Sequence, residues 1–283
     1  MTSTAADALS AAVDALDAAG CETARLDAEL LLAQATGWDR AQLAAEPEAR
    51  LPVGASREYG QMVRRRVRRE PVAYILGRKG FRRIELLVDR RVLIPRPETE
   101  LLVEFAVEQA ARADGRALRF LDVGTGSGAV GLAVADEIPS ASVMAIDTSV
   151  DALRVAQTNV DRLGLGDRVD VVAAGIASLP EQPFDCLLAN LPYVSENEWE
   201  RLQPEIREYE PRDALVAGPT GLEAIEALVA ALHRRTPAGI ALEVGAGQAT
   251  AVVEMLAGVN YWAAVHRDLA GIERVVAALR VFT

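Results

Sequence analysis

Hydrophobic residues recur every three or four positions through the N-terminal quarter of the chain, the spacing that places side chains on one face of an α-helix. Two helices are predicted, ending at Gly20 and Gly37, followed by a short helix over residues 41–45 and a longer one over 56–69. The apolar face of the first two helices is expected to carry Leu9, Val13, Leu16, Leu26, Leu30 and Leu31. Residues 1–70 are therefore interpreted as a small helical domain.

The pattern changes over residues 71–94, where β-branched and aromatic residues form two runs at 72–76 and 84–93. Residues 78–80 carry a turn signal between these runs. The segment is predicted to consist of extended strands in a hairpin that links two domains.

Two prolines then bracket an arginine in the block Ile94-Pro-Arg-Pro-Glu-Thr-Glu100, directly ahead of a helix predicted over residues 101–112. Proline favours extended backbone in the residue before it. Thr99 or Glu98 can cap the start of the helix, because short polar side chains accept hydrogen bonds from the first free N–H groups.

From there to the C-terminus, apolar runs of strand length alternate with helical patterns, which predicts a doubly wound, largely parallel α/β sheet. The strands are expected at 118–123, 142–147, 169–173, 184–189 and 240–244, and the helices at 129–137, 150–163, 221–235 and 248–256. Two further strands, at 261–266 and 274–279, flank a turn at 269–271 and should form an antiparallel edge.

The bulk composition narrows the class of protein. A chain of 283 residues exceeds the usual single-domain size, so one domain of about 200 residues and a smaller one are expected. The net charge of −11 disfavours a general nucleic-acid binder, which needs a basic face. Cys21, Cys186, His233 and His266 are too few and too scattered to indicate a disulfide framework or a metal site. With no membrane-length apolar run, a soluble cytoplasmic protein is expected.

A cluster of alternating glycines interrupts the first strand–helix unit and predicts a nucleotide-binding loop. Glycine allows unusual dihedral angles and lets a ligand approach the backbone. The predicted loop consists of Gly124, Thr125, Gly126, Ser127 and Gly128, directly after the acid Asp122. Asp147 ends the next strand, where an acid conventionally accepts hydrogen bonds from ribose hydroxyls. The spacing of Gly126, Gly128 and Gly131 also satisfies the dinucleotide fingerprint, so a nicotinamide enzyme is one alternative.

The fourth predicted strand ends in Asn190, Leu191, Pro192 and Tyr193. At the carboxyl end of a parallel strand, this turn places an amide, backbone carbonyls and an aromatic face in the crevice where such folds bind ligands. Asn190 and the Leu191 carbonyl can accept the two hydrogens of a planar N–H group, and Tyr193 can pack on its plane. The target is therefore expected to be a planar amine or amide.

Together these blocks resemble the HemK/PrmC family, whose members use S-adenosylmethionine to methylate the side-chain amide nitrogen of a glutamine in peptide-chain release factors. The similar blocks are residues 70–77, 93–100, 121–128, 190–193, 210–215 with Gly221-Leu222, 242–245 and 267–274. The resemblance implies a Rossmann-like methyltransferase domain over 95–283 and a substrate-docking role for the helical domain. It also implies S-adenosylhomocysteine as the product, and release factors as the protein partner.

Carried over by position, the resemblance assigns the loop 124–128 to the methionine part of the cofactor, Asp147 to the ribose, and 190–193 to the glutamine amide. The chain departs from the family at Leu191, where proline is usual; this tetrapeptide resembles that of ribosomal-RNA adenine dimethyltransferases, so adenine N6-methylation remains an alternative. Relatives also place an acid near the adenine, where this chain offers Gly175. A non-catalytic adenosine-binding adaptor is the third alternative.

One basic cluster stands apart from these motifs. Arginines occupy five of the six positions from 64 to 69, on the last predicted helix of the helical domain. A charge run of this kind is either a solvated face or a docking surface for an acidic or RNA-associated partner.

Overall fold

The chain forms two compact units in a computed structural model that describes residues 4–232 and 236–281. The first unit comprises Met1–Arg78 together with Gln203–Tyr209, and the second comprises Lys79–Leu202 and Glu210–Thr283. A short segment from the middle of the sequence thus belongs to the N-terminal unit. His233 and the end of the helix expected over 221–235 lie outside the described residues.

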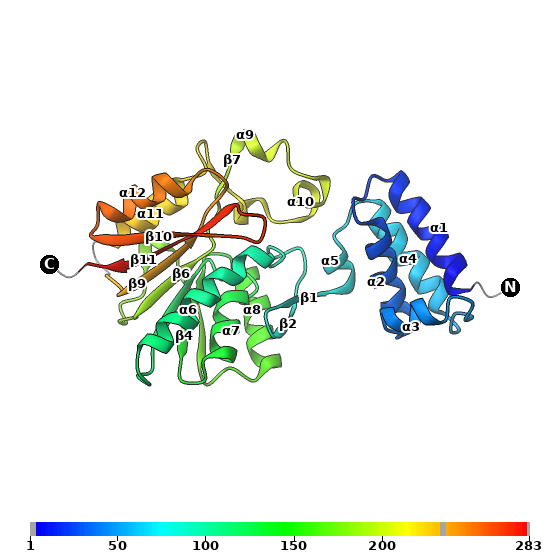
Figure 1. Ribbon diagram of the computed structural model, residues 1–283, viewed down its shortest axis with the longest axis horizontal. Coiled ribbons are helices and arrows are strands. Elements are labelled where there is room, and N and C mark those ends of the chain that lie inside the picture. The colour runs from blue at the N-terminus through cyan, green and yellow to red at the C-terminus, as the bar shows by residue number, and fades with distance from the viewer. Residues whose placement is uncertain (1–3, 233–235, 282–283) are drawn as a thin grey trace. The chain divides into compact units, whose positions relative to one another are not determined.

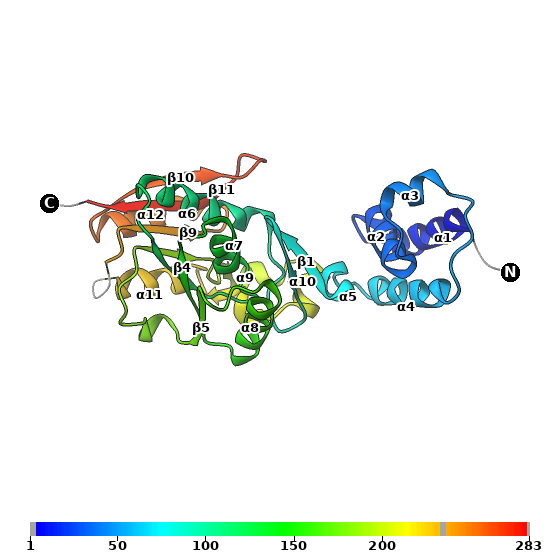
Figure 2. The ribbon, with the colours of Figure 1, turned by 90° about the horizontal axis from the view of Figure 1, so that it is seen from below.

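The first unit contains a bundle of helices (Figure 2). Buried side chains between residues 5 and 76 form its apolar core. Its helices are α1 (Ala5–Ala18), α2 (Ala24–Thr36), α3 (Arg40–Ala45), α4 (Ala55–Val67), α5 (Val72–Leu76) and α10 (Pro204–Tyr209). Thr4 and Asp7 start α1 with a reciprocal capping box. The predicted face of α2 is wrong at Leu26, which is 40% exposed, whereas the predicted Leu31 is buried together with Ala28 and Leu32.

The linker prediction needs two corrections. The run expected to be extended is the helix α5, which begins after Pro71 and ends at Gly77 in a left-handed conformation. Tyr74 and Ile75 are buried on it, so packing overrides the strand preference of their residue types. The hairpin pairs β1 (Arg78–Phe81) with β2 (Ile84–Leu87), so its turn lies at residues 82–83 rather than at 78–80.

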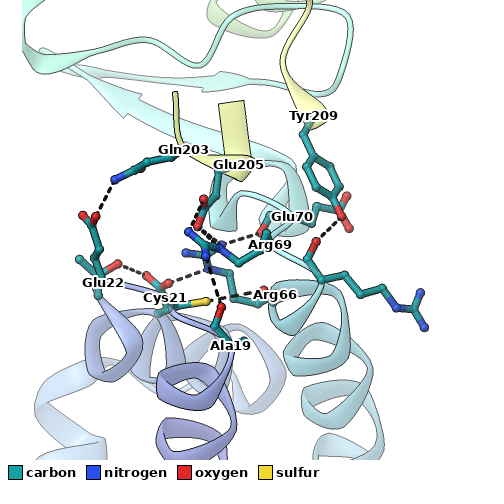
Figure 3. A network of polar contacts seen from close by, with 12 residues as sticks. Ala19, Cys21, Glu22, Arg66, Arg69, Glu70, Gln203, Glu205 and Tyr209 are labelled. Atoms are coloured by element: carbon teal, nitrogen blue, oxygen red, sulfur yellow. Dashed lines mark hydrogen bonds and ion pairs between the residues drawn. The ribbon is translucent and has the colours of Figure 1, made fainter. Parts of the chain in front are cut away.

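An ion-pair network fixes α10 in the first unit (Figure 3). Arg66, only 5% exposed, reaches Asp27 at 2.7 Å and Glu205 of α10 at 2.8 Å. Arg69 donates two hydrogen bonds, of 2.7 and 2.6 Å, to the same Glu205. Tyr209 adds a hydrogen bond of 2.6 Å from its hydroxyl to a backbone carbonyl of the α4 end. Burying Arg66 is tolerable only because two carboxylates compensate its charge.

This network changes the interpretation of the arginine cluster. Arg66 and Arg69 serve the interior of the unit, and Arg65 pairs with Glu70 at 2.8 Å. Arg64 and Arg68 are exposed. Only part of the cluster is therefore presented as a basic surface.

The second unit is built on a seven-stranded sheet with the order β10-β11-β9-β6-β3-β4-β5. Its strands are β3 (Arg119–Val123), β4 (Ser142–Asp147), β5 (Val169–Ala173), β6 (Cys186–Ala189), β9 (Gly239–Glu243), β10 (Tyr261–Arg267) and β11 (Glu273–Arg280). The first five pair in parallel, and β11 and β10 complete one side antiparallel. The fold class and the antiparallel edge predicted from the sequence are confirmed.

Helices cover both faces of this sheet (Figure 1). They are α6 (Glu100–Arg112), α7 (Ala129–Glu137), α8 (Val150–Leu163), α11 (Glu223–Ala231) and α12 (Ala249–Ala257). One buried cluster joins α11 and α12 to the side chains of Leu121 and Val123 on β3. On the opposite face, Gly131 of α7 approaches Asp122, and Phe105 of α6 approaches Gly239. Alternate residues of β3 therefore point to different helix layers, as a pleated strand requires.

Several small elements around the strand ends were not predicted. They are the 3₁₀ turns Pro97–Thr99, Ile176–Ser178 and Arg212–Ala214, the helix α9 (Glu196–Trp199), and the short parallel pair β7 (Val194–Ser195) and β8 (Val216–Gly218). In the described part of the chain, no helix is both long and apolar enough to cross a membrane. No group of His, Cys, Asp or Glu side chains within residues 4–232 and 236–281 is arranged to hold a metal ion.

Candidate functional site

The glycine loop after β3 adopts the conformation that only glycine accepts readily. Gly124, Gly126 and Gly128 have φ values of 73°, 56° and 85°, all in the left-handed region. A Cβ at Gly124 would also lie 3.3 Å from the Leu191 side chain and 3.4 Å from the Asn190 carbonyl oxygen. The loop is therefore closely packed against the turn that follows β6.

Two aspartates accept hydrogen bonds from this loop. Asp122 is 1% exposed and accepts hydrogen bonds from the Thr125 hydroxyl at 2.6 Å and the Gly131 N–H at 3.0 Å. Burial raises the pKa of Asp122 to about 6, although these two hydrogen bonds act to lower it. Asp147, at the end of β4, accepts from the Gly126 N–H and from the Ser149 N–H, both at 2.9 Å. Each oxygen of Asp147 thus holds one backbone donor and retains capacity for another.

A cavity of about 550 Å³ opens where the carboxyl ends of these parallel strands meet. The predicted site residues that line it are Gly124, Gly126, Asp147, Gly175, Asn190, Leu191 and Pro192. Its size is in the range of small-molecule and cofactor sites. Gly175 also makes a close approach, since a Cβ there would lie 2.8 Å from Thr148. This combination of bare backbone and one carboxylate at a strand end fits an adenosine-containing cofactor.

The other predicted loop residues support the cavity from within the fold. The Thr125 hydroxyl is committed to Asp122, and the Ser127 carbonyl accepts a hydrogen bond of 2.9 Å from Asn159. Gly128 starts helix α7. Asn159 is fully buried. Its side chain also accepts a hydrogen bond from the Leu87 N–H and donates one to the Leu87 carbonyl, which connects the hairpin to the glycine loop. This last contact could not be predicted from the sequence, because it depends on how α8 packs.

Asn190 is oriented by Thr99, for which the sequence predicted a helix-capping role. Its side-chain Nδ2 donates to the Thr99 hydroxyl at 3.1 Å. Thr99 stands at the start of α6, but its side chain makes no capping hydrogen bond, so the predicted capping role is wrong. In the described chain, no donor reaches the Asn190 Oδ1. That oxygen is left as the acceptor of the site.

Tyr193 ends the same turn and is anchored by a buried acid. Its hydroxyl donates to Glu243 Oε1 at 3.2 Å, and burial raises the pKa of this hydroxyl. Glu243 is 1% exposed at the end of β9, and burial raises its pKa to about 7. Tyr193 does not line the cavity formed by Gly124, Asp147 and Asn190; it lines a second hollow beside Gly245 and Arg274. Glu243 was not predicted as a site residue, although it lies in the block 242–245 that resembles the family.

One carboxylate joins two of the blocks that resemble the family, residues 93–100 and 210–215. Glu210, 6% exposed, accepts a hydrogen bond of 3.0 Å from the Ile94 N–H and an ion pair from Arg96. The segment carrying Thr99 is therefore held at its other end by residue 210.

The chain is similar in fold to solved structures. The catalytic domain of hMettl16, in complex with a MAT2A 3′UTR hairpin, matches 75% of this chain and 79% of its own with a TM-score of 0.57 at 15% identity. The N-terminal domain of human METTL16 in complex with SAH matches with a TM-score of 0.52, covering 70% of this chain and 76% of its own at 15% identity. At such identities the fold alone is shared.

Similarity in sequence is more specific. Residues 7–77 match the family model of the PrmC N-terminal domain, and residues 120–209 match that of a methyltransferase domain. The release factor glutamine methyltransferase of Gloeobacter violaceus is 41% identical over 88% of either chain, and that of Caulobacter vibrioides is 38% identical over 99% of this chain and 98% of its own. With both parts of the chain matched in this way, the protein belongs to the family of release factor glutamine methyltransferases.

Proposed function

We propose that this protein transfers a methyl group from S-adenosylmethionine to the side-chain amide nitrogen of a glutamine in peptide-chain release factors. The observation that carries the proposal is the orientation of Asn190, whose Nδ2 is held by Thr99 while its Oδ1 remains an acceptor beside the cavity. Its family membership supports the same substrate.

The cavity residues would divide the cofactor among them. The loop 124–128, with its three left-handed glycines, would let the methionine part lie against bare backbone. Asp147 would accept hydrogen bonds from the ribose hydroxyls, and Gly175 would leave room for the adenine. When bound, S-adenosylmethionine supplies an activated methyl group on its sulfonium. No contribution from a metal ion enters the proposal.

The task of the protein residues is to position a weak nucleophile. The lone pair of an amide nitrogen is delocalised into its carbonyl, so contact alone does not make it reactive. Asn190 Oδ1 and the Leu191 carbonyl would each accept one hydrogen of the target NH₂ group, which aims the nitrogen along one line. The same two oxygens stabilise the positive charge that develops on nitrogen during transfer. The methylated nitrogen is strongly acidic and loses its proton afterwards without a dedicated base.

The helical unit is proposed to dock the protein substrate. It matches the PrmC N-terminal domain, and its exposed Arg64 and Arg68 offer a basic patch. A net charge of −11 for the whole chain disfavours a polynucleotide substrate. The adenine alternative remains the second candidate because Leu191 stands in the amine-binding turn and an adenine amino group presents the same planar pair of hydrogens.

The proposal is tested by incubating the purified chain with radiolabelled S-adenosylmethionine and, separately, a release factor, a short RNA and a short DNA. Label is expected in the release factor. Label in a nucleic acid instead would favour the adenine alternative, and label in none of them would refute a methyl-transfer role for these substrates. A parallel titration with NAD should show no binding, which separates the nicotinamide alternative.

A further inference from the structure

The sequence block that leads into α6 contains a buried hydroxyl that does no capping. Thr99 is 3% exposed, and a threonine at a helix start usually accepts from the N–H groups of the first turn. Here that capping bond is absent, and the hydroxyl accepts from Asn190 Nδ2 at 3.1 Å. A contact across 91 residues of sequence thus replaces a local one.

The direction of this hydrogen bond follows from its donor. An amide NH₂ group can only donate, so the Thr99 oxygen is the acceptor and the Asn190 Oδ1 is the end of the amide that does not contact Thr99. In the described part of the chain, no donor reaches that Oδ1.

A buried carboxylate holds the far end of the turn. The Tyr193 hydroxyl donates to Glu243 Oε1 at 3.2 Å, which anchors the last residue of the tetrapeptide. Glu243 lies at the end of β9, which pairs in parallel with the strand that leads into Asn190. The sheet therefore determines where this second anchor lies.

We propose that Thr99 is a positioning residue that fixes the amide of Asn190 with its oxygen toward the target. The inference rests on the proposed function and adds the residue that orients its acceptor. Without the hydroxyl, the Asn190 side chain is free to turn by half a rotation. It would then present N–H groups to the N–H groups of the target, an orientation that cannot bind the nucleophile.

Kinetics of three threonine variants test the role of Thr99. Thr99→Val keeps the side-chain shape but removes the hydroxyl, and should lower kcat roughly tenfold to a hundredfold, the effect of a misplaced reacting group. Thr99→Ser keeps the hydroxyl and should stay within about threefold of wild type. Thr158→Val, on the exposed side of α8, is the matched control and should leave kcat unchanged. Calorimetric affinity for S-adenosylhomocysteine should be equal in all of them.

A double-variant comparison separates positioning from general damage. In an Asn190→Ala background, Thr99→Val should cause no further loss of kcat, because the group it positions is already gone. The inference is overturned if Thr99→Val has wild-type kcat, if serine fails to rescue, or if the Thr99→Val and Asn190→Ala losses simply multiply.

A spectroscopic readout keeps the inference independent of the substrate assignment. The ¹⁵N-labelled side-chain NH₂ of Asn190, identified by its loss in Asn190→Ala, should exchange slowly with water in wild type and Thr99→Ser, and rapidly in Thr99→Val. If wild type transferred no methyl to a release factor, the proposed function would fail while this measurement still decided the anchoring. Equal exchange in wild type and Thr99→Val would overturn the inference whatever the activity.

Discussion

Replacing Glu243 with glutamine should change how the stability of the second unit depends on pH. The carboxyl is 1% exposed, and burial raises its pKa from 4.5 to about 7. Glu98 adds to the rise, while Thr99, Tyr193 and Arg274 oppose it. Each unit of pKa corresponds to about 1.4 kcal/mol, so the buried charge is held at a cost of about 3 kcal/mol.

The sign follows from proton binding. Between pH 4.5 and 7 the folded protein binds the Glu243 proton more tightly than the unfolded chain does, so stability falls as pH rises through this window. The loss between pH 5.5 and pH 8 is about 2 kcal/mol for this group. Glutamine does not titrate. The free energy of unfolding of Glu243→Gln, relative to wild type, should therefore rise by about 2 kcal/mol from pH 5.5 to pH 8.

Urea unfolding at the two pH values measures this difference. In a Trp38→Phe background the remaining tryptophans, Trp199 and Trp262, both report on the second unit. Comparing variant with wild type at each pH removes the contribution of the other titrating groups. If the two proteins differ by the same amount at pH 5.5 and pH 8, Glu243 is not a buried acid of raised pKa.

Three further substitutions test the cofactor site, the target site and the helical unit. Asp147→Ala should weaken S-adenosylmethionine binding by about 1.5–3 kcal/mol, the scale of hydrogen bonds to a charged group, and unchanged calorimetric affinity would remove the ribose role. Asn190→Ala should lower kcat roughly 10² to 10³-fold with little change in cofactor affinity, whereas an aspartate there should retain more activity; a wild-type rate would contradict the mechanism. Glu205→Gln leaves two arginines under-compensated and should destabilise the first unit by about 3 kcal/mol, followed by Trp38 fluorescence. Glu29→Gln, whose arginine partners are exposed, is its control and should cost less than about 1 kcal/mol.

The sheet could be predicted from sequence because each parallel strand is a short apolar run with a clear stop. The run at residues 118–123 ends in glycines, and the one at 184–189 ends in Asn190 and a proline. Strand ends of a parallel sheet meet at one edge, so Gly124, Asp147 and Asn190 were expected together, and all three line one cavity. Local pattern and general topology were sufficient for this much.

The supports of the site could not be predicted, because they depend on contacts between distant residues. Nothing in the sequence near Thr99 distinguishes a helix cap from an anchor for Asn190, and the choice is made by the position of β6 relative to α6. Glu205 gives a similar lesson, since its partner Arg69 is 136 residues away. The misassigned α5 differs in kind: its β-branched residues favour a strand locally, and the core of the helical unit holds them in a helix.

The central claim is that the amide nitrogen of a glutamine side chain receives the methyl group. Tandem mass spectrometry of a release factor, after incubation with S-adenosylmethionine and either wild type or Asn190→Ala, locates any added methyl to a single residue. The account predicts one added methyl on a glutamine side chain with wild type, formed at least a hundredfold more slowly by the variant. A methyl on another residue type, an unmodified release factor, or equal rates for the two proteins would contradict it.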